Sequence, residues 1–261
     1  MVKYTMIRLY STIRCSLMPE LNPVKLLAQS LMLSLILSMS VTVKAMEVPL
    51  RAFTASYDLI SRGMNLGTTT LSLEPVNDMW RWRLTTRARG IYSLLTSKKP
   101  YFETTFSHNQ DQVRLQQIVI ADENKKDNTE SSRFDWESGQ MQGTRKGKQT
   151  SAALSTEVYD YQSIHLLAAA MQLQDLKSTT VSFYRKGKLV ESSMTFLGKG
   201  SLVIGGKNID ARIYEQTVAG SKTRVKYFYD PKNPLLPLII ERRRGDDSPS
   251  TLKLREVEWR S

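Results

Sequence analysis

Alternation of apolar and polar residues along short segments constrains the fold of this chain more than any other feature. In residues 53–59, Phe53, Ala55, Tyr57 and Leu59 alternate with polar residues, which places their side chains on one face of an extended strand. Similar segments, separated by turns rich in glycine and asparagine, recur to the C-terminus. The pattern predicts a mainly β protein, either a single curved antiparallel sheet or an open β-barrel of about ten to twelve strands. Residues 122–132 and 143–156 are interpreted as loops.

One central α-helix is predicted over residues 160–174. Asp160 is expected to cap its N-terminus, and the three alanines at 168–170 favour a helix. Its apolar stripe is expected to consist of Ile164, Leu167, Ala168 and Met171. Such a helix can approach a sheet closely and fill its concave side.

The N-terminal region is typical of a secretory signal peptide. Residues 26–43 form the only long apolar run, basic residues precede it, and small residues follow at 43 and 45. An uncleaved membrane anchor is the alternative, since 18 residues nearly span a bilayer. We predict cleavage after Ala45, which leaves residues 46–261 as a single antiparallel β domain in the periplasm, without a transmembrane segment. Translation from Met1 or from Met18 stays open.

The residue counts exclude several chemistries. Cys15 is the only cysteine and lies in the predicted leader, so disulfides and thiolate catalysis are excluded from the mature chain. Two histidines, His108 and His165, are too few for a His-rich metal site, and neither a metal nor a cofactor is predicted. The net charge of +12 does not indicate a nucleic-acid partner, because an exported protein rarely meets nucleic acid and no binding motif occurs.

Three short motifs resemble a known bacterial family. The first strand has the form Phe-x-Ala-x-Tyr from Phe53, the predicted helix begins Asp160-x-x-Ser163, and a late segment at 229–238 reads YDPKNPLLPL. Together they resemble the domain of unknown function 3108 family (DUF3108), exported proteins found mainly in Gram-negative species, over residues 50–259. The resemblance implies a curved, barrel-like antiparallel sheet in the periplasm, and it brings no established activity or catalytic residues. His165 departs from the apolar residue expected at that point of the helix.

Four arginines form the most distinctive candidate surface. Arg81, Arg83, Arg87 and Arg89 share one face of a predicted strand. Guanidinium groups in such a row repel one another unless they are solvated or paired with acids or anionic ligands. The row is a candidate contact for lipopolysaccharide, phospholipid headgroups or acidic glycans. The alternative is a solvated face with cross-strand partners such as Glu74 or Glu103.

Aromatic residues at alternating positions suggest a second candidate site. They could line an apolar cavity inside the sheet, or they could form the packed core that any β protein of this size needs. Trp80, Trp82 and Trp136 are the candidate ligand-binding residues of this kind. The full set is Tyr57, Trp80, Trp82, Phe102, Phe106, Phe134, Trp136, Phe183, Tyr227 and Tyr229.

No catalytic residue is predicted. Asp160, Ser163 and His165 have the residue types of an acid, a nucleophile and a base. However, residues two apart on a helix point to different faces. A carboxylate pair for glycoside hydrolysis could be drawn from Asp58, Glu74, Asp78, Glu103 and Asp160, but no feature selects a pair. Pro234 and Pro237 indicate an edge strand or the entrance to a strand.

We therefore expect a non-enzymatic periplasmic protein that binds an apolar or anionic envelope molecule, or a partner protein, in envelope maintenance. A periplasmic hydrolase of envelope glycans or lipids is the second hypothesis, and a structural or assembly factor is the third. An interior cavity lined by the aromatics would favour the first hypothesis. Two carboxylates facing each other across a cleft would favour the second, and an unpaired, flat, uncharged strand edge would favour the third.

Overall fold

A computed structural model describes residues 48–260, except residues 91, 94–98, 110–111 and 155–156. The predicted signal peptide, its cleavage site after Ala45 and Cys15 lie outside the described residues. Among the helices of the described part, none is long and apolar enough to cross a membrane.

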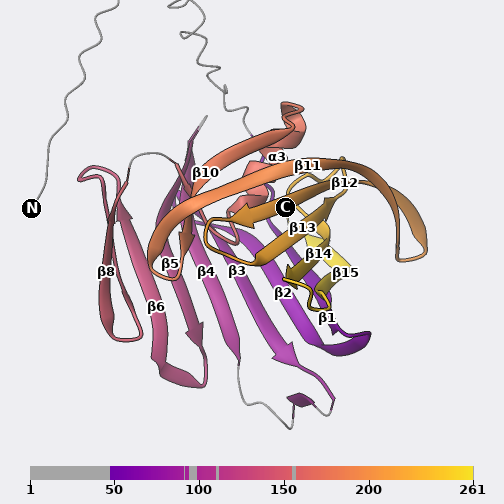
Figure 1. Ribbon diagram of the computed structural model, residues 1–261, viewed down its shortest axis with the longest axis horizontal. Helices are drawn as coiled ribbons and strands as arrows, with labels where there is room; N and C mark the ends of the chain where they lie inside the picture. Colours follow the sequence, from indigo (N-terminus) through magenta and orange to yellow (C-terminus); the bar gives the residue numbers. More distant parts are fainter. Residues whose placement is uncertain (1–47, 91, 94–98, 110–111, 155–156, 261) are drawn as a thin grey trace, which may run out of the picture. The chain divides into compact units, whose positions relative to one another are not determined.

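The described residues form fifteen strands and the ten-residue helix α3, and Figure 1 shows the strands as one rolled sheet. The first eight strands are β1 (Phe53–Ser61), β2 (Met64–Val76), β3 (Met79–Ala88), β4 (Pro100–Asn109), β5 (Gln112–Asp122), β6 (Lys125–Asp135), β7 (Gln140–Arg145) and β8 (Lys148–Ala153). The remaining elements are β9 (Val158–Tyr159), α3 (Ile164–Leu173), β10 (Ser178–Arg185), β11 (Lys188–Ile204), β12 (Lys207–Val218), β13 (Thr223–Tyr229), β14 (Pro237–Arg244) and β15 (Ser250–Trp259).

Neighbouring strands of the sheet are mostly neighbours in the sequence. The spatial order runs from β8 back to β1, then to β15, and from there back to β9. The ladders are antiparallel, apart from a short parallel pairing of β9 with β10. The sheet is open, because β8 and β9 occupy its two ends. The prediction of a mainly β, open antiparallel sheet is confirmed, whereas the expected number of ten to twelve strands was too low.

The strands missed from the sequence are in the segments interpreted as loops. Strand β8 and the first part of β6, up to residue 132, fall in these segments. The end of β6 and the start of β7 were predicted, because Phe134 and Trp136 alternate before a turn at 137–140 and a return strand. The inward-facing positions of β6 include the polar residues Glu130 and Ser132, both of which are buried, so apolar residues do not alternate there. Hydrophobic periodicity therefore could not reveal these strands.

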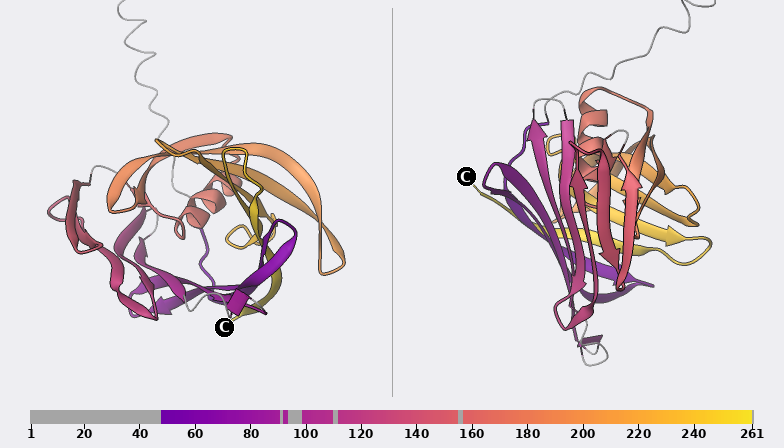
Figure 2. Two further views of the ribbon diagram at one scale, coloured as in Figure 1. Left: turned by 60° about the horizontal axis from the view of Figure 1, so that its bottom comes forward. Right: turned by 90° about the vertical axis from the view of Figure 1, so that its left-hand side faces the viewer.

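Helix α3 lies inside the curl of the sheet, as the left view of Figure 2 shows. It begins at Ile164 and ends at Leu173, so the predicted bounds of 160–174 were too wide. Ser163 directly precedes the helix but makes no side-chain cap hydrogen bond. Asp160 instead stabilises the turn before the helix, where its Oδ1 accepts hydrogen bonds from the backbone N–H groups of Gln162 at 3.0 Å and Ser163 at 2.7 Å.

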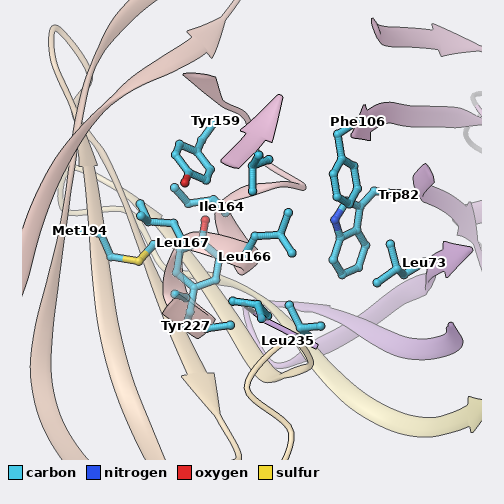
Figure 3. Packing of buried hydrophobic residues seen from close by; sticks show 14 of the residues in the cluster. Leu73, Trp82, Phe106, Tyr159, Ile164, Leu166, Leu167, Met194, Tyr227 and Leu235 are labelled. Carbon is cyan, nitrogen blue, oxygen red and sulfur yellow. The ribbon is translucent and has the colours of Figure 1, made fainter. Parts of the chain in front are cut away.

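The core joins this helix to the inner face of the sheet. Figure 3 shows Leu166 and Leu167 of α3 among side chains such as Trp82 and Tyr227 from strands on different sides. Seven of the predicted aromatics are buried in this cluster: Tyr57, Trp82, Phe106, Phe134, Phe183, Tyr227 and Tyr229. The other three, Trp80, Phe102 and Trp136, are partly buried against it. These ten aromatic side chains therefore pack in the core that the alternative interpretation described.

The proline-containing segment precedes an inner strand of the sheet. Strand β14 begins at Pro237 and lies between β13 and β15. Of the two alternatives predicted from the prolines, the strand entrance is confirmed and the edge strand is wrong. Pro237 sits where its missing N–H disturbs the ladder least, and its carbonyl accepts a hydrogen bond of 2.9 Å from the hydroxyl of Tyr57.

Candidate functional site

The open sheet overlaps itself where the β10–β11 hairpin passes beneath β6 and β8. The hydroxyl of Tyr184 on β10 donates to Glu130 Oε1 at 2.8 Å and lies 2.9 Å from Ser132 Oγ, both on the inward face of β6. At the hairpin turn, a Cβ on Gly187 would lie only 2.8 Å from Thr150 Cγ2 of β8, and Gly187 has a φ of +74°. A glycine is thus required there both by the turn and by the close approach.

A groove of about 540 Å³ opens beside this overlap. On one side lie Ala153 at the end of β8 and Glu157 before β9. The β10–β11 ribbon supplies the other side, with residues 180–182 and 189–191. In the ladder of this ribbon, Ser182 pairs with Glu191 and Tyr184 with Leu189, so these side chains share the face that turns away from α3.

The groove contains two carboxylates. Glu157 accepts hydrogen bonds from the backbone N–H of Val113 at 3.3 Å and from the hydroxyl of Tyr159 at 2.9 Å. Burial, together with the nearby negative charge of Glu157, raises the pKa of Tyr159 well above its usual value, so the phenol keeps its proton. Glu191 is exposed on the other side. Within the described ranges neither carboxylate forms an ion pair, so the groove is acidic in a basic protein.

Strand β8 presents a backbone edge next to the groove. The hydrogen bond of 2.8 Å from the N–H of Leu154 to the carbonyl of Gly139 fixes the ladder between β7 and β8. By the alternation of an antiparallel ladder, the backbone groups of Gln149, Ser151 and Ala153 point away from β7. In the part of the chain that the structure describes, β7 is the only strand paired with β8. The edge from Gln149 to Ala153 is uncharged and lacks proline.

The arginine row lies on the outer face of β3, away from the core. Arg81 donates to Glu74 Oε1 through Nε at 3.0 Å and Nη2 at 2.6 Å. Arg83 lies 3.9 Å from Glu103 and stacks 5.3 Å from the ring centre of Tyr101. Both acids are the cross-strand partners that the alternative interpretation named. The remaining two, Arg87 and Arg89, are exposed.

The candidate tryptophans lie apart from the arginines. Trp82 is fully buried on the opposite face of β3 and packs against Phe53 at 5.5 Å between ring centres. Trp80 is partly buried against the core. The indole N–H of Trp136 donates to the carbonyl of Leu115 at 2.7 Å, more than thirty residues along the chain from Arg89. The structure does not bring these tryptophans and the arginine row together in one site.

Ser163 and Asp160 meet in the interior, but His165 does not join them. The Ser163 hydroxyl donates to Asp160 Oδ1 at 2.7 Å, and the Thr104 hydroxyl donates to Oδ2. Burial raises the pKa of Asp160, although these hydrogen bonds oppose the shift. His165 instead places Nδ1 2.7 Å from the hydroxyl of Tyr229, and burial lowers its pKa to about 3. These residues stabilise the helix and the core, and their polar atoms are enclosed.

The other carboxylates considered for hydrolysis lie on the outside of the sheet. Glu74 and Glu103 each lie beside an arginine. Asp58 is paired with Lys253 in the ladder between β1 and β15. Asp78 lies in the exposed turn after β2. Asp160 is interior. Among the described residues, no group of three or more His, Cys, Asp or Glu side chains could hold a metal ion.

The groove residues were missed from the sequence. Glu157 and Glu191 are far apart in the chain, and they line one groove only because the sheet overlaps itself. The one local signal was the uncharged run at residues 149–154, which follows a basic turn and had been interpreted as a loop.

Comparison with known protein families gives one match that covers most of the described residues. A family model described as "Protein of unknown function (DUF3108)" matches residues 52–254. The chain belongs to the DUF3108 family. The family resemblance drawn from the sequence motifs is thereby confirmed. A search of curated proteins found no match.

One solved structure shares the fold described above, and a second is reported for comparison only. A β-barrel-like protein of domain of unknown function DUF1849 from Brucella abortus is 11% identical, with a TM-score of 0.57, and the match covers 82% of this chain and 100% of that one. The hypothetical lipoprotein YmcC from Escherichia coli K12 is 12% identical, with a TM-score of 0.30, and the match covers 87% and 94%. At such identity, the Brucella structure shows a shared fold alone.

Proposed function

We propose that this DUF3108 protein is a non-enzymatic exported protein that binds a partner molecule of the bacterial envelope in the groove beside β8. The observation that carries the proposal is the open overlap of the sheet, where the unpaired edge strand β8 reaches a groove of about 540 Å³ at its last residue, Ala153. The interior offers a poorer site, because the aromatic side chains pack there against α3. Function resides in sites rather than in folds, and the groove is the concave site with convergent polar groups.

The proposal that the protein is exported rests on its N-terminal sequence, whose regions follow the order of a signal peptide. A basic region, an apolar run and small residues follow one another before residue 46. The envelope is then the compartment in which the groove would meet its partner. A periplasmic protein of this kind would act in envelope maintenance by holding or sensing a molecule, without chemical conversion.

Native mass spectrometry of the protein recovered from the periplasm, followed by solvent extraction, tests this proposal. We expect the polypeptide to have lost residues 1–45 and to carry a discrete co-purifying mass. Thr180→Trp should abolish that mass, because position 180 is exposed within the groove. Thr195→Trp is the matched control, since Thr195 is exposed on the same ribbon outside the groove residues. A bound mass that survives Thr180→Trp, or a bare polypeptide from every preparation, would refute the groove as the binding site.

A further inference from the structure

We propose that the groove accepts an extended segment of a partner polypeptide, which pairs with the free edge of β8 and presents a lysine or arginine to Glu157 and Glu191. This inference deepens the proposed function and rests on it, because it names the class of molecule that binds in the groove.

The edge of β8 is a ready template for strand addition. The outward N–H and C=O groups of Gln149, Ser151 and Ala153 recur at every second residue, which is the spacing at which an added strand forms hydrogen bonds. Proteins usually protect such an edge with charges, prolines, bulges or a covering element. Lys148 stands at the start of β8, and the following five residues carry no charge. The edge thus lacks the sequence features that would discourage pairing.

The β10–β11 ribbon provides a surface on which an added strand would lie. Strand β6 already covers the tip of this ribbon through the contact of Tyr184 with Glu130 and Ser132. A strand paired with β8 would continue the same overlap, with its inward side chains over Leu189 and Ser182. The half-buried Leu189 favours apolar side chains at these inward positions. The bound segment should therefore alternate in character, as strands covered on one face do.

The charge of the groove selects a basic segment. Glu157 is held by the N–H of Val113 and the hydroxyl of Tyr159, and Glu191 is exposed across the groove. A lysine or arginine between these two carboxylates would form charge-assisted hydrogen bonds. Lipids and glycans lack amide donors and acceptors at the repeat of a β-strand, so a polypeptide matches the edge and the charge together.

A defined peptide tests the inference on the protein recovered from the periplasm. The probe is a capped eight-residue peptide of alternating valine and lysine. The first control replaces its lysines by glutamates, and the second carries N-methyl groups on alternate amides, which removes the hydrogen bonds of one edge and keeps the side chains. We expect the probe to bind and to slow hydrogen exchange at the N–H groups of Gln149, Ser151 and Ala153. Both controls should bind roughly tenfold more weakly or worse.

A pair of variants tests the role of charge. Glu191→Gln should weaken the probe about tenfold, whereas Glu258→Gln should leave its binding unchanged, because Glu258 lies on β15 and is absent from the groove lining. Circular dichroism and thermal unfolding verify that both variants are folded. Loss of binding in both variants would show that the peptide responds to net charge alone, and would overturn the inference.

Other outcomes separate the inference from the proposed function. Equal binding of the N-methylated peptide would refute strand addition and leave the groove as a side-chain site. A probe that does not bind, together with a lipid or glycan mass that is lost in Thr180→Trp, would refute the peptide and retain the groove as the site. If Thr180→Trp changes neither the co-purifying mass nor the binding of the probe, both the inference and the proposed function fail.

Discussion

The rolled sheet has two joins, one between β1 and β15 and one between β8 and the β10–β11 ribbon. At the first, Phe53–Ser61 pair with Ser250–Trp259 along a ladder that shifts register once, between Ser56 and Tyr57, and inward pairs such as Phe53 with Trp259 are apolar on both strands. At the second, no ladder forms between the described residues of β8 and β10, and the two sides meet through Tyr184 and through Gly187 next to Thr150. One join is a continuous ladder, and the other is an overlap with a groove.

The difference between the two joins shows which interactions allow two strands to pair and close a sheet. At the closed join the Phe53 ring lies 5.3 Å from that of Trp259 and 5.5 Å from that of Trp82, so hydrogen bonds and apolar burial reinforce each other. At the open join the inward residues of β6 include the polar Glu130 and Ser132, which contact the Tyr184 hydroxyl, beside Phe134, whose ring lies 6.0 Å from that of Tyr184. Polar contacts of this kind hold two layers together without requiring strand pairing, and an edge is left free.

The largest expected effect contrasts single truncations at the two joins. Phe53→Ala should lower the free energy of unfolding by about 3–5 kcal/mol, because it leaves a cavity beneath the closed ladder. Leu189→Ala, in the groove wall, should cost about 1 kcal/mol, since Leu189 is only half-buried. Denaturant titration followed by tryptophan fluorescence measures both. Equal losses would show that the open join contributes as much to stability as the closed one.

Acid should destabilise the folded protein through His165, which is enclosed in the interior. His165 packs against the rings of Trp82 at 5.7 Å and Tyr227 at 5.5 Å, and its pKa is lowered to about 3 by burial. Unfolded histidine titrates near 6.5, so below that pH the unfolded state binds the extra proton and the folded state does not. The contribution of His165 to stability should therefore fall by about 3 kcal/mol between pH 7 and pH 4.

The variant His165→Leu isolates this contribution. It should be less stable at pH 7, because the Tyr229 hydroxyl loses its partner, but its stability should depend less on pH. Asp160, whose pKa is raised by burial, contributes a change of opposite sign that is present in both proteins and cancels in the comparison. Urea titrations at several pH values provide the measurement. An unchanged pH slope in the variant would assign the acid sensitivity to other groups.

The smallest expected effect concerns the outer face of β3, close to the closed join. Arg87 and Arg89 are exposed, whereas Arg81 and Arg83 lie beside Glu74 and Glu103. The double change to glutamine at 87 and 89 should leave thermal unfolding unchanged and weaken the salt-sensitive binding to anionic phospholipid vesicles. The same change at 81 and 83 should affect vesicle binding less. Vesicle co-sedimentation at two salt concentrations checks this, and identical results for both pairs would remove the row as an anionic contact.

Local patterns in the sequence were sufficient for the elements whose inward residues are apolar. The alternation in residues 53–59 predicted β1, and the alanines at 168–170 located α3 within the curl. The acids Glu74 and Glu103 were named as alternative partners of the arginine row from strand pairing alone. The first part of β6 was missed because its inward positions hold Glu130 and Ser132, whose partner Tyr184 lies about fifty residues further along the chain.

The candidate groove could not be predicted for a related reason. Glu157 and Glu191 become neighbours only after the sheet has rolled up and overlapped, and neither residue stands in a motif. Composition indicated a basic protein. The charged site predicted from the sequence was therefore the arginine row and not an acidic groove. An acidic groove in a basic chain is a property of tertiary structure.

The ladder between β1 and β15 also governs the order of events during folding. A side-chain hydrogen bond joins Arg260 to Thr54 across 206 positions, so β1 pairs with a strand that leaves the ribosome or a translocation channel long after it. Most other ladders link adjacent strands through short turns, and these hairpins can form early. Loop-closure entropy makes the remote pairing slow. Until the final residues arrive, one side of β1 has no partner, and the nascent sheet stays vulnerable to aggregation for as long as synthesis or transport lasts.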